Sequence, residues 1–178
     1  MSSPIDKNRE RLKRVYDNYR TARMSREYYA CRLSFFQNCN FWYEIVLAIG
    51  TSGSAISGWY VWQTATGKTV WAILTGAAAL LAILKPALQL PKHIEQYSKL
   101  HTGYSSLSYD YGKLVDDIKA TGGITREMTK SLNKAEERFK ELALQDDPKP
   151  SEKLLRDCQG KVKKHVPPFA VWYPEQTQ

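Results

Sequence analysis

The sequence predicts an all-α membrane protein, in which a two-helix transmembrane hairpin is joined to a cytoplasmic helical bundle or coiled coil. Two observations predict this class. The 178-residue chain has a net charge of +8, yet residues 45–67 hold no charged side chain and residues 69–91 hold only Lys85. A seven-residue spacing of tyrosine and leucine follows over residues 97–118. Long uncharged runs are typical of membrane spans, and heptads are typical of packed helices.

Residues 1–40 are predicted to form a basic amphipathic helix in the cytoplasm. Apolar side chains recur at helical spacing on one face, and the opposite face is basic. The apolar positions are Leu12, Val15, Tyr19, Ala22, Tyr29, Leu33 and Phe36.

Residues 41–91 are predicted to form the transmembrane hairpin, with spans at about 43–62 and 69–87. A helix of 23 uncharged residues is about 34 Å long, and the hydrocarbon core of a bilayer is about 30 Å thick. Aromatic residues at both edges of the first span are typical of the headgroup region. Nine Lys and Arg residues precede the hairpin and one lies in its loop, so both termini are expected to be cytoplasmic.

Small residues in the first span suggest close helix packing. Gly50, Ser54 and Gly58 recur every four residues, and such spacing lets helix backbones approach closely in lipid. Two compatible interpretations remain open: the two spans pack on each other, or an oligomer lines a polar path with its first spans. The candidate pore or packing residues are Glu44, Gly50, Thr51, Ser54, Gly58 and Gly76.

Residues 92–145 are predicted to form an antiparallel pair of helices. The first helix is expected to end at Thr121-Gly122-Gly123, and Thr125 is expected to cap the second. The first helix carries a seam of a and d positions, at Tyr97, Leu100, Tyr104, Leu107, Tyr111 and Leu114. The spacing leaves open whether this seam packs within one chain or between subunits. Residues 146–178 follow as a linker, a short basic helix and an aromatic tail.

No catalytic residue, metal ligand or cofactor is predicted. The three histidines lie beside no recognisable nucleophile or carboxylate arrangement, and the three cysteines match no metal or redox spacing. Gly67-Lys68-Thr69 resembles the end of a phosphate-binding loop, but Trp62 occupies the position of its first glycine. The chain is therefore expected not to be an enzyme and not to bind nucleic acid.

The layout resembles the SLATT family, which comprises two-transmembrane effector domains of prokaryotic conflict systems. The features that carry the resemblance are a basic helix with Tyr16, Tyr19, Tyr28 and Tyr29, the hairpin from Trp42 to Leu84, and the long helix from Tyr97 to Leu114. The resemblance covers roughly residues 5–145, and it is one of architecture and not of an invariant motif. It implies a bacterial inner-membrane protein whose oligomer breaches the membrane during phage infection.

Two functional hypotheses follow. The first is an oligomeric effector that forms a pore or disrupts the membrane in anti-phage defence. The second is a non-conducting oligomeric membrane scaffold that recruits a cytoplasmic partner. The partners expected are the lipid bilayer, further copies of the chain, and a sensor protein or nucleotide second messenger as trigger.

Overall fold

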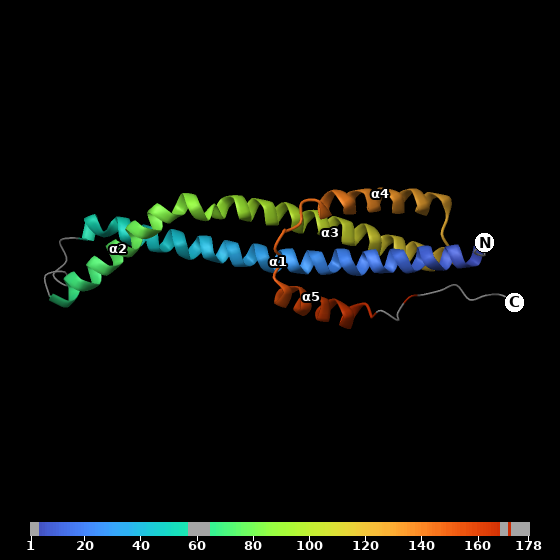
Figure 1. The fold of residues 1–178 in the computed structure, drawn as a ribbon, viewed down its shortest axis with the longest axis horizontal. Coiled ribbons are helices and arrows are strands. Elements are labelled where there is room, and N and C mark those ends of the chain that lie inside the picture. Colours follow the sequence, from blue (N-terminus) through green and yellow to red (C-terminus); the bar gives the residue numbers. More distant parts are fainter. Residues whose placement is uncertain (1–3, 57–64, 168–170, 172–178) are drawn as a thin grey trace. The chain divides into compact units, whose positions relative to one another are not determined.

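The computed structural model describes residues 4–56, 65–167 and 171. The elements are α1 (Pro4–Ile56), α2 (Ala65–Leu88), α3 (Leu90–Thr121), α4 (Arg126–Ala143) and α5 (Glu152–His165) (Figure 1). The all-α part of the predicted fold class agrees with these described residues, among which no strand is found. The chain divides into two compact units. Unit 1 comprises residues 1–31 and 97–178, and unit 2 comprises residues 32–96.

In unit 1, α3 packs between α1 and α4, and α5 lies along α1 (Figure 1). The heptad positions of α3 form the centre of the core. Tyr104, Leu107 and Tyr111 are each at most 1% exposed. The other elements bury fewer side chains against them, including Val15 and Ala22 of α1, Leu132 and Ala135 of α4, and Cys158 and Val162 of α5.

Local sequence explains where the helices of unit 1 begin and end. Gly122 has φ +72, and its amide donates to the carbonyl of Ile118; glycine adopts this left-handed conformation without the steric cost of a Cβ atom. The hydroxyl of Thr125 accepts a hydrogen bond from the amide of Met128, 3.2 Å away, which caps α4. Ser151 occupies the corresponding position before α5 but makes no side-chain capping bond.

Unit 2 contains the second part of α1, the whole of α2 and the start of α3. One residue, Gln89, separates α2 from α3. It has φ 42, which is uncommon outside glycine, and its carbonyl accepts hydrogen bonds from the amides of Lys92 and His93. The chain therefore changes direction at Gln89, two residues before Pro91.

The predicted transmembrane hairpin, with spans at about 43–62 and 69–87, is wrong. No helix formed by the described residues is both long enough and apolar enough to cross a bilayer. The prediction of a membrane protein and that of an inner-membrane location with cytoplasmic termini are corrected by the same finding.

The physical reason differs between the two predicted spans. In α2, the uncharged stretch between Lys68 and Lys85 has 16 residues and is about 24 Å long, below the roughly 30 Å of a hydrocarbon core. In α1, only 12 described residues follow Glu44, and glycine and hydroxyl side chains fill residues 50–54. The remainder of the predicted first span lies outside the described residues. Counting charges alone overestimated the apolar length of both helices.

Candidate functional site

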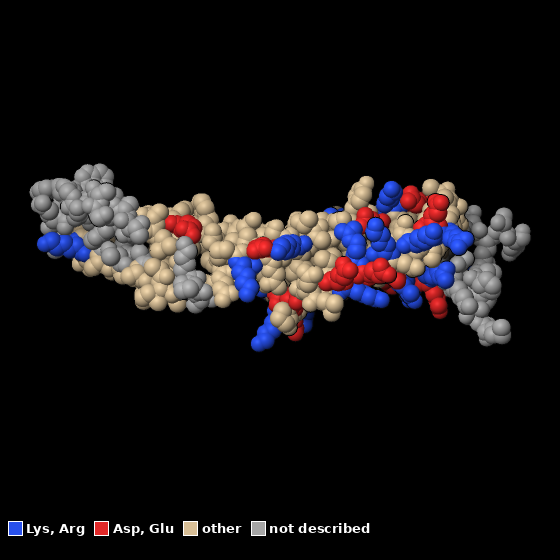
Figure 2. Space-filling model, turned by 90° about the horizontal axis from the view of Figure 1, so that it is seen from above, with Lys and Arg blue, Asp and Glu red and all other residues tan. Residues whose placement is uncertain are grey.

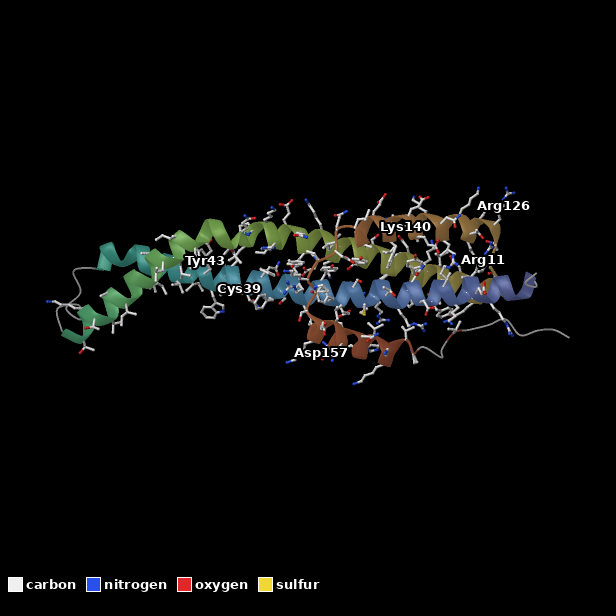
Figure 3. All side chains as sticks on the ribbon, in the orientation of Figure 1. Arg11, Cys39, Tyr43, Arg126, Lys140 and Asp157 are labelled. Atoms are coloured by element: carbon white, nitrogen blue, oxygen red, sulfur yellow. The ribbon has the colours of Figure 1, made fainter. Side chains whose placement is uncertain are left out.

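The described residues of unit 2 form an apolar groove with a volume of about 620 Å³. Residues of α1 line one side, and residues of α2 and the start of α3 line the other. We call it the apolar groove; its main residues are Phe35, Phe36, Trp42, Tyr43, Leu81 and Leu88. Cys39 and Tyr43 are labelled on this stretch of α1 in Figure 3. The groove follows from helical periodicity, because Phe35, Cys39, Trp42 and Val46 recur every three or four residues and therefore share one face of α1.

Three specific contacts involve residues that line this groove. The hydroxyl of Tyr43, a residue 7% exposed, donates a hydrogen bond to the carbonyl oxygen of Leu81 at 2.9 Å. The ring of Phe36 stacks on His93 with 5.1 Å between ring centroids, and the guanidinium of Arg32 lies 5.3 Å from the same ring centre. A cation placed over an aromatic face stabilises that arrangement. The groove is therefore a formed feature of unit 2.

Large apolar side chains are exposed along both helices of unit 2 that line the groove. Of the twelve large hydrophobic residues exposed in the described part of the chain, ten belong to unit 2. They are Phe35, Phe41, Trp42, Ile49, Val70, Ile73, Leu80, Ile83, Leu84 and Leu88. Figure 2 shows the same division, since charged side chains gather over unit 1 and are sparse over the described part of unit 2. Exposed apolar surface that is concentrated in one part of a protein is typical of interaction sites.

The structure describes the surroundings of two of the residues predicted to line a pore or pack the spans. Glu44 is exposed on α1, and Gly76 is exposed on α2. A Cβ atom added at Gly76 would meet no described atom within 4 Å, apart from its own helix backbone and chain neighbours. Gly50, Thr51 and Ser54 lie in α1. Gly58 lies outside the described residues.

The predicted seam residues lie together in unit 1. Tyr97, Leu100, Tyr104, Leu107, Tyr111 and Leu114 are each at most 5% exposed within the single chain. The structure thus packs this face of α3 inside one subunit, which answers the question that the spacing left open.

Three tyrosine hydroxyls and two aspartates, at and beside this seam, form a hydrogen-bonded cluster. The hydroxyls of Tyr29 and Tyr104 both donate to the same carboxylate oxygen, Oδ1 of Asp146, at 2.8 Å and 2.9 Å. The hydroxyl of Tyr97 donates to Oδ2 of Asp147 at 3.1 Å, and the amide of Asp147 donates to the hydroxyl of Tyr29 at 3.2 Å. We call these five residues the Tyr–Asp cluster: Tyr29, Tyr97, Tyr104, Asp146 and Asp147.

Stacking and burial reinforce the cluster. The ring of Tyr29 stacks on those of Tyr104 and Tyr97, with centroids 5.6 Å and 6.0 Å apart. Burial raises the pKa of both Tyr29 and Tyr104 well above the ordinary tyrosine value, and the neighbouring Asp146 carboxylate raises each further. Both hydroxyls thus stay protonated as donors. The cluster holds the α4–α5 connection against α1 and α3, which is a structural role.

Sequence reasoning missed two of these features. Asp146 and Asp147 were assigned to a linker, although adjacent carboxylates near a tyrosine stripe can accept its hydroxyl bonds. Phe35 was not singled out. Phe41 and Trp42 are among the aromatic residues at the edge of the predicted first span, which were assigned to the headgroup region of a bilayer. Their spacing with Cys39 and Val46 was the available signal for a groove.

The described residues contain no group of three or more His, Cys, Asp or Glu side chains placed to hold a metal ion. Burial raises the pKa of the Cys158 thiol, with Cys31 as its next strongest influence. No protein-family model matches the chain, and it has no match among curated proteins or solved structures. The resemblance to the SLATT family therefore stays a prediction.

Proposed function

We propose that this protein is a non-enzymatic helical scaffold whose copies associate through the apolar surface of unit 2. The observation that carries the proposal is the concentration of exposed large hydrophobic side chains in that unit, ten of the twelve found among the described residues. The pore hypothesis required two transmembrane helices, which the described residues do not form. The scaffold hypothesis does not require transmembrane helices once its membrane location is left out.

The amount of exposed apolar surface is sufficient for a stable interface. Trp42, Ile73 and Ile83 are 63%, 66% and 72% exposed. Burying a large aromatic side chain removes about 150–250 Å² from water and an aliphatic one somewhat less, so the ten partly exposed residues together present on the order of 1,000 Å² over all their faces. A standard interface buries about 800 Å² from each partner. Each Å² of this apolar area that an interface buries contributes about 25 cal/mol to association.

A second copy of the chain is the occupant that unit 2 fits best. Unit 2 contains an apolar groove whose lining includes the exposed, projecting rings of Phe35 and Trp42, and the exposed ring of Phe41 contacts that of Trp42. In a two-fold interface the same patch meets itself, so the projecting rings of one copy can enter the groove of the other. Charge does not oppose this contact, because unit 2 holds only six charged residues, with a net charge of +2.

The test is the oligomeric state of the full chain, measured by sedimentation velocity over a concentration series. We expect reversible association in the native chain. The substitution Trp42→Gln should weaken association by about 2 kcal/mol, roughly 30-fold in Kd, because large buried aromatic side chains dominate interface energies. Leu144→Gln is the matched control, since Leu144 is 89% exposed but belongs to unit 1; it should leave association unchanged.

Two results would overturn the proposal. A chain that stays monomeric at every concentration would show that no second copy covers the groove. Equal weakening by Trp42→Gln and Leu144→Gln would place the interface elsewhere. A flotation assay with lipid vesicles separates another occupant, because vesicle binding by a chain that does not self-associate would assign the apolar surface to lipid.

A further inference from the structure

A second hollow lies in unit 1, between α1 and α3, with a volume of about 420 Å³. It is separate from the apolar groove and from the residues of the Tyr–Asp cluster. Three cationic side chains and two serine hydroxyls line it: Arg23, Arg26, Lys113, Ser105 and Ser108. We call it the basic cleft. Its volume is within the range of about 300–1,000 Å³ that is usual for sites of small ligands.

Helical periodicity builds the basic cleft from two matching faces. Tyr19, Arg23 and Arg26 share one face of α1, because they are four and three residues apart. Ser105, Ser108 and Gly112 share the facing side of α3 for the same reason.

The small residues on α3 leave the space that the hollow occupies. Ser108 is 5% exposed and lies at its base. At one end, a Cβ atom on Gly112 would lie 3.5 Å from the ring of Tyr19, so this ring closes the cleft there.

The charges of the basic cleft are unbalanced. Three cations face one carboxylate, Asp116. Arg26 is neutralised by Glu27, whose carboxylate oxygen lies 2.6 Å from its guanidinium. Arg23 and Lys113 have no ion-pair partner among the residues that the structure describes. The nearby carboxylate of Asp110 is engaged by Arg138 at 2.9 Å. With Asp116 and Glu27 counted against the three cations, a net charge of +1 remains in and beside the cleft.

We propose that the basic cleft binds the phosphate group of a small anionic ligand. A phosphate has several acceptor oxygens and a charge near −2, which suits Arg23 of α1 together with Lys113 and the two serine hydroxyls of α3, while Asp116 is the one carboxylate of the lining that opposes it. The guanidinium fork of Arg23 can donate two hydrogen bonds to one phosphate. Tyr109 is 74% exposed at the rim of the cleft, so an organic group attached to the phosphate would meet an aromatic ring. This site is independent of the self-association proposed for unit 2.

Isothermal titration of the full chain, at constant ionic strength, tests the site with three probes. Inorganic phosphate and phenyl phosphate should each bind saturably, and acetate should bind at least tenfold more weakly than either. Tighter binding of phenyl phosphate would identify a phosphate ester as the preferred class, and equal binding would identify free phosphate. Absence of saturable binding by both phosphate probes would overturn the proposal.

Two substitutions locate the binding. Arg23→Gln should weaken phosphate binding at least tenfold, because it removes the bidentate donor. Arg14→Gln is its matched control, since Arg14 is an exposed arginine of the same helix outside the cleft, and it should have no effect. Equal losses in the two variants would show attraction to general positive charge and would overturn the site.

Ser105→Leu separates shape from charge. It fills the cleft without changing any charge, and it should abolish binding while circular dichroism shows native helicity. Unchanged binding in a folded Ser105→Leu variant would also overturn the proposal.

Discussion

Units 1 and 2 are both built from α-helices, but unit 1 buries most of its large apolar side chains and unit 2 leaves many of them exposed. Unit 1 has 38 charged residues among 113, and it buries the apolar face of each helix in a shared core. Unit 2 has 6 charged residues among 65, and ten of its large apolar side chains are exposed. Helix propensity therefore does not distinguish the units. The distribution of apolar residues around each helix does.

The helix α1 shows the difference within one element. Its part in unit 1 presents an apolar stripe, with Leu12, Val15 and Ala22 buried and polar residues elsewhere. Its part in unit 2 has large apolar side chains on several faces, so Phe41 and Ile49 stay exposed while Tyr43 is buried. A helix that is apolar all round needs neighbours on all sides. The described residues of unit 2 supply too few, and this is the physical basis for expecting a further copy there.

The largest expected contrast is between two leucine truncations. Leu107→Ala should destabilise the chain by about 2–5 kcal/mol, because Leu107 is 0% exposed and its loss leaves a cavity. Leu80→Ala should change unfolding by about 0.5 kcal/mol or less in the dissociated chain, because Leu80 is 64% exposed. Urea denaturation followed by circular dichroism measures both. A similar loss of unfolding free energy in the two variants, at a protein concentration that keeps the chain dissociated, would contradict the distinction between the units.

The second contrast concerns buried polar contacts. Asp146→Ala should cost about 2–3 kcal/mol, because it leaves the hydroxyls of Tyr29 and Tyr104 without their shared acceptor. Asp157→Ala is the control: Asp157 is an exposed carboxylate of α5 (Figure 3), and its loss should be close to neutral. The free energies of unfolding of the two variants, each compared with the native chain, measure this contrast. Equal, small losses would mean that the Tyr–Asp cluster adds no stability.

Part of the core of unit 1 could be predicted from the sequence, and part of it could not. The heptads at Tyr97, Tyr104 and Tyr111 predicted the buried face of α3, and Gly122 and Thr125 predicted the turn between α3 and α4, since both signals are local. The partner of the tyrosine stripe was not predictable, because Asp146 lies 42 residues from Tyr104 and 117 from Tyr29. Only the return of the chain after α4 brings these groups together.

The site was harder to predict than the fold. An uncharged run has the same composition whether its apolar surface meets lipid, a second chain or its own core, and this ambiguity produced the incorrect transmembrane hairpin. The basic cleft was missed for another reason. Arg23 and Arg26 belong to the predicted basic helix of residues 1–40, and Ser105 and Ser108 lie between seam positions of α3. The sequence does not show that the two helices place these residues opposite each other.

A pH titration gives the third contrast, which is confined to unit 1. Burial raises the pKa of Tyr111 to about 12, a change partly offset by the Asn18 side chain, which hydrogen-bonds to its hydroxyl. An unfolded tyrosine has a pKa of about 10. Between these values the unfolded chain releases a proton that the folded chain retains, so stability is complete below pH 10 and falls as the pH rises towards 12.

Denaturation midpoints measured from about pH 9 to pH 11 should therefore decline in the native chain. Tyr111→Phe should show a shallower decline, and the difference in slope isolates Tyr111 from lysines that also titrate in this range. Identical slopes would show that Tyr111 ionises equally in both states.

The smallest expected effect compares hydroxyl deletions in the two units. Tyr43→Phe in unit 2 removes one hydrogen bond to the neutral carbonyl of Leu81, and should cost about 1 kcal/mol. Tyr104→Phe in unit 1 removes a bond to the Asp146 carboxylate, and should cost more, because bonds to charged acceptors are about twice as strong. Matched urea titrations of the two variants at a concentration that keeps the chain dissociated measure the difference. A larger loss in Tyr43→Phe would reverse the comparison, since it would mean that unit 2 depends more on one polar contact than unit 1 does on its buried cluster.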